Sequence, residues 1–281
     1  MIRDTFFSLP RFVNVCRKEM VEGWKANLLR VVLMYGMLAL VLVWNGMIEY
    51  GGYNRSVEDL ERHIWRFGVL AFVWGLVIMG CLSASFTMER MKTKNNRLSV
   101  LMTPATMFEK FFARWLVFTF GFLLAYLVAY KLADWTRMLF LMVKHPGMES
   151  VGSVPLLSLL VEGGRNSLAN WTLFGDCGYF MMAVGGYFLF QSCFVLGSSV
   201  WPKNAFMKTF VAGVVIVISY VLVGSLTVKL FWNASYMINN PNEPSEETMK
   251  LLITLFSFGM TLFNWVLAYF RFKESEIINR W

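Results

Sequence analysis

Six long apolar runs constrain the fold of this 281-residue chain more than any other feature. Each run holds about 20 mostly apolar residues, enough to cross roughly 30 Å of hydrocarbon as an α-helix. The short alternating segments typical of a membrane-spanning barrel are absent from the sequence. The sequence therefore predicts an all-α membrane protein with six transmembrane helices. The predicted spans are Leu28–Ile48, Phe67–Met88, Trp115–Ala133, Tyr179–Trp201, Phe210–Leu230 and Leu251–Arg271.

The distribution of basic residues predicts how the spans are oriented. Seventeen of the 26 lysines and arginines lie in four segments: before the first run, between runs two and three, between runs four and five, and after the sixth run. This count includes the basic residues within the ends of the adjoining runs. Basic residues collect in cytoplasmic loops, so we expect both termini in the cytosol. The net charge of +8 has the same cause, and we expect a lipid bilayer and no nucleic acid as partner.

Two segments outside the runs have predicted structure of their own. In residues 1–27, a face of Phe12, Val13, Cys16, Met20 and Trp24 predicts an amphipathic helix lying in the membrane interface. The alternative is a charged segment that only sets topology. Segment 134–173 is the longest exterior piece, and its apolar stretch Val154–Val161 is too short to span, so we expect it to be partly buried or interfacial. No exterior segment is long enough for a large domain, so residues 1–281 are predicted to form a single transmembrane domain.

The chemistry of common enzymes and carriers is missing from the sequence. There is no G-x-x-x-x-G-K-[ST] phosphate loop, and His63 and His145 lie outside the spans and in no H-E-x-x-H motif. Gly197-Ser198-Ser199 has no histidine within a span to act as a base, so we predict no catalytic site and no metal site. Ionisable residues are scarce within the spans, which argues against an ion-coupled carrier. The class of protein that remains is a transporter whose energy comes from another chain.

The segment between the second and third spans is far longer than a connection requires. It contains a charged stretch (89–94), a short apolar element with a proline (101–105), and the stretch Glu109-Lys110-Phe111-Phe112-Ala113-Arg114-Trp115-Leu116. With the amphipathic N-terminal helix, which is similar to an elbow helix, this layout resembles the permease subunits of type-2 ABC transporters, mostly bacterial exporters. The last two elements look like the L-x-x-P-x-[ST]-x-x-E-K-[FL]-x-x-R-W-L pattern of that family.

The resemblance implies a permease that couples ATP hydrolysis on a separate ATPase subunit to substrate translocation in a bacterial inner membrane. This chain would bind no cofactor, and ATP and Mg²⁺ would sit on the partner. Residues 89–114 would form a cytoplasmic coupling loop, built from a stiff helix continuous with the second span. A second permease chain, identical or sister, would complete the pathway. The candidate ATPase-coupling residues are Glu89, Arg90, Lys92, Lys94, Arg97, Glu109 and Lys110.

A polar face on the fourth span is the candidate pathway. Tyr187, Gln191 and Ser198 share one helical face, and Gln191 is the only long amide side chain deep in any span. The alternative is ordinary hydrogen bonding between helices. Two other functions stay open: a membrane scaffold or assembly subunit without transport, and, with less support, an ion-coupled carrier. The substrate is not determined by the sequence; lipid, drug, peptide, saccharide precursor and ion all fit.

Overall fold

The computed structural model describes residues 6–51, 56–146, 151–160, 172–231 and 245–274. Within these ranges the chain forms helices and no strand. In chain order they are α1 (Leu9–Tyr50), α2 (Val57–Ser85), the 3₁₀ turn η1 (Glu89–Met91), α3 (Lys94–Leu101), α4 (Met107–Leu116), the π turn η2 (Val117–Gly121), α5 (Phe122–Lys144), α6 (Leu156–Leu160), α7 (Cys177–Val200), α8 (Ala205–Phe231) and α9 (Glu246–Lys273).

Six helical rods in the described part of the chain are long and apolar enough to cross a membrane. Each one coincides with a predicted span, which confirms the prediction of an all-α membrane protein with six spans. The chain is therefore described as a multi-pass membrane protein. The rods are Leu9–Tyr50, Val57–Met91, Met107–Lys144, Cys177–Val200, Ala205–Val223 and Glu246–Lys273.

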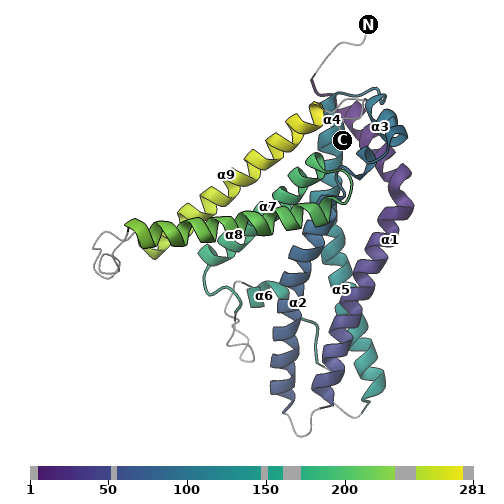
Figure 1. Ribbon diagram of the computed structural model, residues 1–281. Helices are drawn as coiled ribbons and strands as arrows, with labels where there is room; N and C mark the ends of the chain where they lie inside the picture. The colour runs from purple at the N-terminus through teal and green to yellow at the C-terminus, as the bar shows by residue number, and fades with distance from the viewer. Residues whose placement is uncertain (1–5, 52–55, 147–150, 161–171, 232–244, 275–281) are drawn as a thin grey trace.

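The helices pack as two groups that meet at α2 (Figure 1). In the first group α1 packs along α5, and α2 packs against both. In its core, the buried hydroxyls of Tyr126 and Tyr130 donate to the carbonyls of Phe72 and Gly68, each at 2.8 Å, so these polar atoms are satisfied. In the second group α7 packs along α9 and against α2, around a core of Cys81, Ala84, Met88, Phe111, Phe194, Val195, Ala268 and Phe272.

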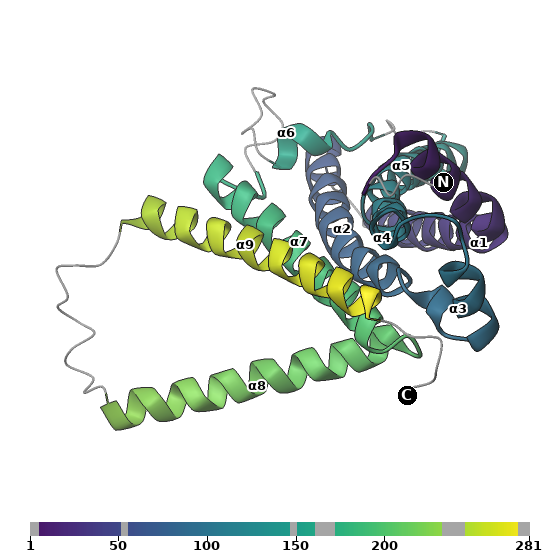
Figure 2. The same cartoon turned by 90° about the horizontal axis from the view of Figure 1, so that it is seen from above.

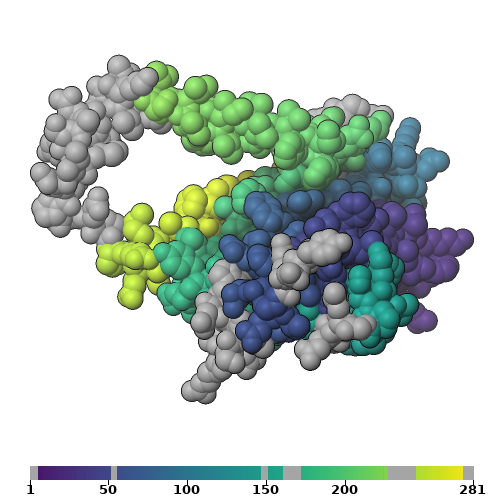
Figure 3. Space-filling model, turned by 90° about the horizontal axis from the view of Figure 1, so that it is seen from below, coloured from purple at the N-terminus to yellow at the C-terminus, as the bar shows by residue number. Residues whose placement is uncertain are grey.

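Helix α8 contacts the bundle mainly at its beginning. There Phe206 stacks on Phe194, and a Cβ atom at Gly197 would lie only 1.8 Å from Thr209 Oγ1, so only glycine allows this close approach. Beyond this contact α8 diverges from α7 and α9 (Figure 2), and open space separates it from α9 (Figure 3). The large apolar side chains from Phe210 to Leu226 are exposed and available to lipid.

Two helix boundaries differ from the prediction. Helix α1 runs without interruption from Leu9 to Tyr50, so the N-terminal segment continues directly into the first span and has no helix end near residue 27. The third rod continues to Lys144, eleven residues beyond the predicted end at Ala133, so segment 134–173 begins as helix. The extension is possible because Asp134 and Arg137 neutralise each other one turn apart, among otherwise apolar residues.

A polar socket around the middle of α5 holds the segment 151–160. The Asp134 carboxylate accepts from Arg137 Nη2 at 2.7 Å and from the Val154 amide at 2.9 Å, and Arg137 also donates to the Gly152 carbonyl. Both charged side chains are buried. The leucines Leu156, Leu159 and Leu160 of α6 are buried too, which agrees with the expectation of a partly buried segment; residue 161 lies outside the described residues.

Candidate functional site: a charged cleft between α1 and the α2–α4 connection

The connection between α2 and α4 (residues 86–106) is folded as two short helical pieces. The expected helix continuous with the second span is not formed, because α2 ends at Ser85. At this end the hydroxyls of Ser85 and Thr87 donate to the carbonyls of Cys81 and Ala84, which disfavours continued helix. The turn η1 and the separate helix α3 follow, and the Thr93 hydroxyl caps α3 by accepting from the Asn96 amide.

Glu109 anchors the end of this connection to the start of α1. Its carboxylate is fully buried and forms a capping box with Thr106 at the start of α4. The same carboxylate accepts from the Ser8 amide at 2.8 Å, and from Arg11 Nε and Nη2 at 2.6 and 2.9 Å. Two further lysines lie in the same region: Lys110 Nζ donates to the Leu101 carbonyl and Lys18 Nζ to Thr103 Oγ1. The non-helical stretch between the end of α3 at Leu101 and the start of α4 at Met107 is thus held from both sides.

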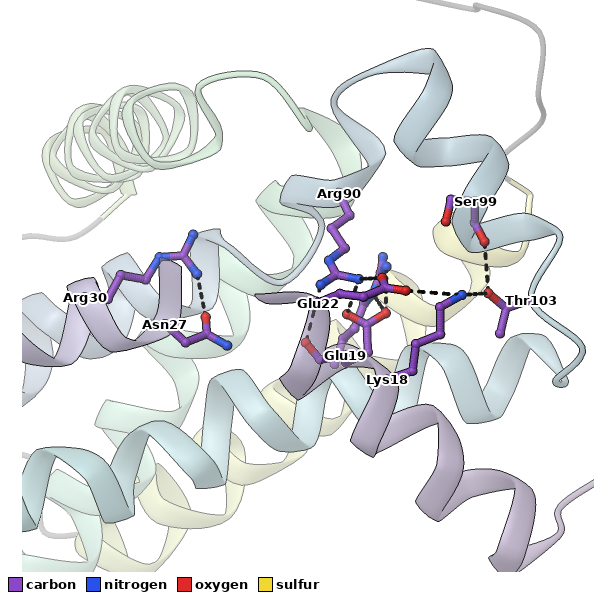
Figure 4. Close-up of polar contacts among 9 residues, drawn as sticks. Lys18, Glu19, Glu22, Asn27, Arg30, Arg90, Ser99 and Thr103 are labelled. Carbon is purple, nitrogen blue, oxygen red and sulfur yellow. Dashed lines mark hydrogen bonds and ion pairs between the residues drawn. The ribbon is translucent and has the colours of Figure 1, made fainter. Parts of the chain in front are cut away.

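A second set of ion pairs joins the middle of the connection to α1 (Figure 4). Glu19 Oε1 accepts from Nε and Nη2 of the buried Arg114, at 3.2 and 3.0 Å. Arg90 Nη1 lies 2.6 Å from Glu22 Oε2 and 3.3 Å from Glu19 Oε2. These contacts cross from α1 to η1 and α4, so they hold three separate elements together. Short charge-assisted contacts of this kind are the stronger class of hydrogen bond.

Arg30 makes the third connection between α1 and this region. It forms an ion pair with Glu89 and donates to Asn27 Oδ1 at 3.0 Å. Its guanidinium also lies over the Phe86 ring, 4.1 Å from the centroid. Such cation–π contacts add about 0.5–1 kcal/mol at partly exposed positions. Helix α1 therefore contacts the connection and α4 at three positions along its length, at Arg11, at Glu19 with Glu22, and at Arg30.

This arrangement encloses a cleft of about 320 Å³, which we call the loop cleft. The volume lies at the lower end of the range for small-ligand pockets, roughly 300–1,000 Å³. Its charged lining consists of three acidic and four basic side chains, namely Glu19, Glu22, Glu89, Arg30, Arg90, Lys92 and Arg114. No group of three or more potential metal ligands occurs among the residues that the structure describes.

The candidate ATPase-coupling residues divide into two kinds. Glu89, Arg90, Arg97, Glu109 and Lys110 bind other parts of this chain, with Arg97 Nη2 donating to the Met91 carbonyl at 3.1 Å. Only Lys92 and Lys94 are exposed and have no partner among the described residues. Sequence reasoning missed Glu19, Arg30 and Arg114, which carry much of the network. The three-residue spacing of Glu19 and Glu22 within a basic segment was the available signal.

The candidate pathway residues all lie on the buried side of α7. Gln191 is fully buried, and neither amide atom has a hydrogen-bond partner within the described structure. The Tyr187 hydroxyl also lacks a partner and lies close to Gly80 of α2. Ser198 Oγ donates to its own helix, at the Val195 carbonyl. The interhelical hydrogen bond of this region is made by other residues, since Asn264 of α9 donates to Ser192 Oγ at 3.0 Å.

Comparison with known proteins does not add a family to this description. No protein-family model matches the chain, and no curated protein or solved structure matches it significantly. The fold and the site therefore define the chain only as an α-helical, multi-pass membrane protein with a braced, charged connection between its second and third spans.

Proposed function

We propose that this chain is the permease subunit of an ATP-driven ABC exporter, with ATP and Mg²⁺ bound by a separate ATPase subunit. The observation that carries the proposal is the connection between α2 and α4, which is longer than a link needs and is braced against α1 by buried and half-buried ion pairs. A scaffold subunit without transport has no evident need for such stiffness. The proposal places the chain in a bacterial inner membrane with both termini in the cytosol.

Stiffness is the property that mechanical coupling requires. Closure of an ATPase dimer is a rigid-body motion, and a soft contact would absorb it before it reached the spans. Here a push on η1 and the adjoining α3 reaches α1 through Arg90, and it reaches α4 through Lys110, which donates to the Leu101 carbonyl at the end of α3. The pairs of Arg114 with Glu19 and of Glu109 with Arg11 then tie α4 to α1. The two rods that begin or end at the connection, α2 and α4–α5, receive the motion directly.

The outward surface of the connection has the chemistry expected for a protein contact. Lys94, Asn95 and Ser99 are exposed on the connection and do not line the cleft, and Met102 is 79% exposed. An exposed methionine on the same connection as exposed basic and amide groups suits a groove with an apolar floor and an acidic rim. The second permease chain remains part of the proposal, and we assign no interface to it.

Gln191 is the pathway residue that the packing favours most. A buried amide without a partner costs free energy, about 1–3 kcal/mol, and calls for a compensating contact. A polar group of a substrate, or water in a pathway, supplies one. Tyr187 presents a second unpartnered polar group, its hydroxyl, one turn away, whereas the Ser198 hydroxyl is already bonded to its own helix.

Reversing one free charge on the connection tests the proposal. Lys94→Glu is expected to lower the affinity for the ATPase subunit at least about tenfold, because a like charge would then face an acidic rim. The measurement is the amount of ATP-hydrolysing subunit that co-purifies with the tagged chain from native membranes. Lys144→Glu, an equally exposed lysine at the end of α5, is the matched control and should leave recovery unchanged. Equal recovery with both variants would argue for a scaffold, or for lysines that only set topology.

A further inference from the structure

Two cationic groups lining the loop cleft have hydrogen-bonding capacity that the protein does not use. Arg114 is 1% exposed, and its Nη1 atom has no hydrogen-bond partner although Nε and Nη2 both bind Glu19. A buried guanidinium nitrogen without an acceptor is costly, and Arg114 lines the cleft, so a ligand bound there can supply the missing acceptor. Lys92 lines the same cleft and has no partner among the described residues.

The charges around the cleft favour an anionic ligand. Its three carboxylates are all engaged by arginines: Glu19 by Arg114 and Arg90, Glu22 by Arg90, and Glu89 by Arg30. Four cations face these three anions, which leaves one positive charge in excess. The excess corresponds to Lys92, the one lining cation without a carboxylate. Asn96 and Thr93 line the cleft beside it and supply further polar groups.

We propose that the loop cleft binds a phosphate group, held by Arg114 Nη1 and Lys92. Both groups donate hydrogen bonds that a phosphate accepts strongly. The proposal needs only the cleft and does not depend on the transport function proposed above.

The position of the cleft along α1 favours a phospholipid headgroup as the source of that phosphate. Gly23, Asn27 and Arg30 of α1 line the cleft, while Trp24 and Leu28, on the same turns, are 55% and 54% exposed apolar side chains. The predicted first span also begins at this level, at Leu28. Charged groups at the end of a span lie among the headgroups. A soluble phosphate is the other source of the same chemistry.

The experiment measures lipid binding to the delipidated, full-length chain in detergent by native mass spectrometry. The probes are dioleoyl phosphatidylglycerol, dioleoylglycerol, which has the same acyl chains without phosphate, and inorganic phosphate. Lys92→Ala is expected to weaken phosphatidylglycerol binding about tenfold, the loss of one charge-assisted contact. Lys94→Ala is the matched control, since Lys94 is also exposed but does not line the cleft, and should change binding less than about twofold.

The possible outcomes distinguish a lipid phosphate from a soluble phosphate, and they also show whether the proposal itself fails. Binding of phosphatidylglycerol but not of inorganic phosphate, with the Lys92 dependence, supports the cleft and assigns a lipid. Binding of inorganic phosphate with the same dependence, in competition with the lipid, supports the cleft and assigns a soluble ligand. Equal effects of the two lysine variants, no effect of either, or equal binding of dioleoylglycerol would overturn the proposal. Arg114→Lys, which keeps the charge beside Glu19 but removes Nη1, should reproduce the Lys92→Ala loss.

Discussion

Replacing Glu109 with alanine is expected to make trypsin cut the α2–α4 connection about 100-fold faster, the effect of losing about 3 kcal/mol of local stability. The variant removes the acceptor for the Ser8 and Thr106 amides and for two nitrogens of Arg11. It also leaves Arg11 partly buried without its carboxylate. Cleavage after Lys92 and Lys94 reports the opened fraction when opening is fast relative to cutting.

Another first-turn glutamate provides the control for this variant. Glu58 lies exposed in the first turn of α2, so Glu58→Ala loses only its interaction with the helix dipole. We expect cleavage to change less than about fivefold in that case, the effect of at most about 1 kcal/mol. If Glu109→Ala were cut no faster than Glu58→Ala, the buried anchor between α1 and α4 would contribute no stability.

Asp134→Ala is expected to lower the free energy of unfolding in detergent by about 4 kcal/mol, because it leaves the buried Arg137 without its counter-charge. The Val154 amide loses its acceptor at the same time. The measurement is denaturant unfolding followed by tryptophan fluorescence. Release of segment 151–160 should accompany the loss, since the same socket holds it.

The chain also contains an exposed ion pair with the same three-residue spacing as Asp134 and Arg137. Asp59 and Arg62 are 3.6 Å apart and each more than half exposed, so Asp59→Ala should cost at most about 1 kcal/mol. The double variant Asp134→Leu/Arg137→Leu should lose less stability than Asp134→Ala alone, because it buries no uncompensated charge. A double variant as unstable as the single one would mean that the hydrogen bonds to the segment, and not the unpaired charge, dominate.

The fold class was predictable because the signal for a membrane span is local. An uninterrupted apolar run such as Phe67–Met88 identifies a spanning helix without knowledge of any other segment. The ends of the helices were less predictable, because they depend on neighbours. The third rod continues past Ala133 because Asp134 and Arg137 neutralise each other, and α2 stops at Ser85, whose hydroxyl binds the backbone.

The candidate site was only partly predictable, because its contacts join residues far apart in the sequence. Arg11 and Glu109 are 98 residues apart, and Glu19 and Arg114 are 95 apart. From sequence alone, Arg90 and Glu109 present charges that suit an external partner equally well. Only the packing of α1 against α4 shows that these charges bind within the chain and that Lys92 and Lys94 are left free.

Photocrosslinking in native membranes tests the central proposal, a permease driven by a separate ATPase, most directly. A photoreactive amino acid replaces Met102, 79% exposed on the α2–α4 connection, or Val143, 82% exposed at the end of α5. The proposal predicts that the Met102 position captures a subunit that is also labelled by a photoreactive ATP analogue, and that the Val143 position does not. Capture of such a subunit from Val143, or of none from Met102, would contradict it.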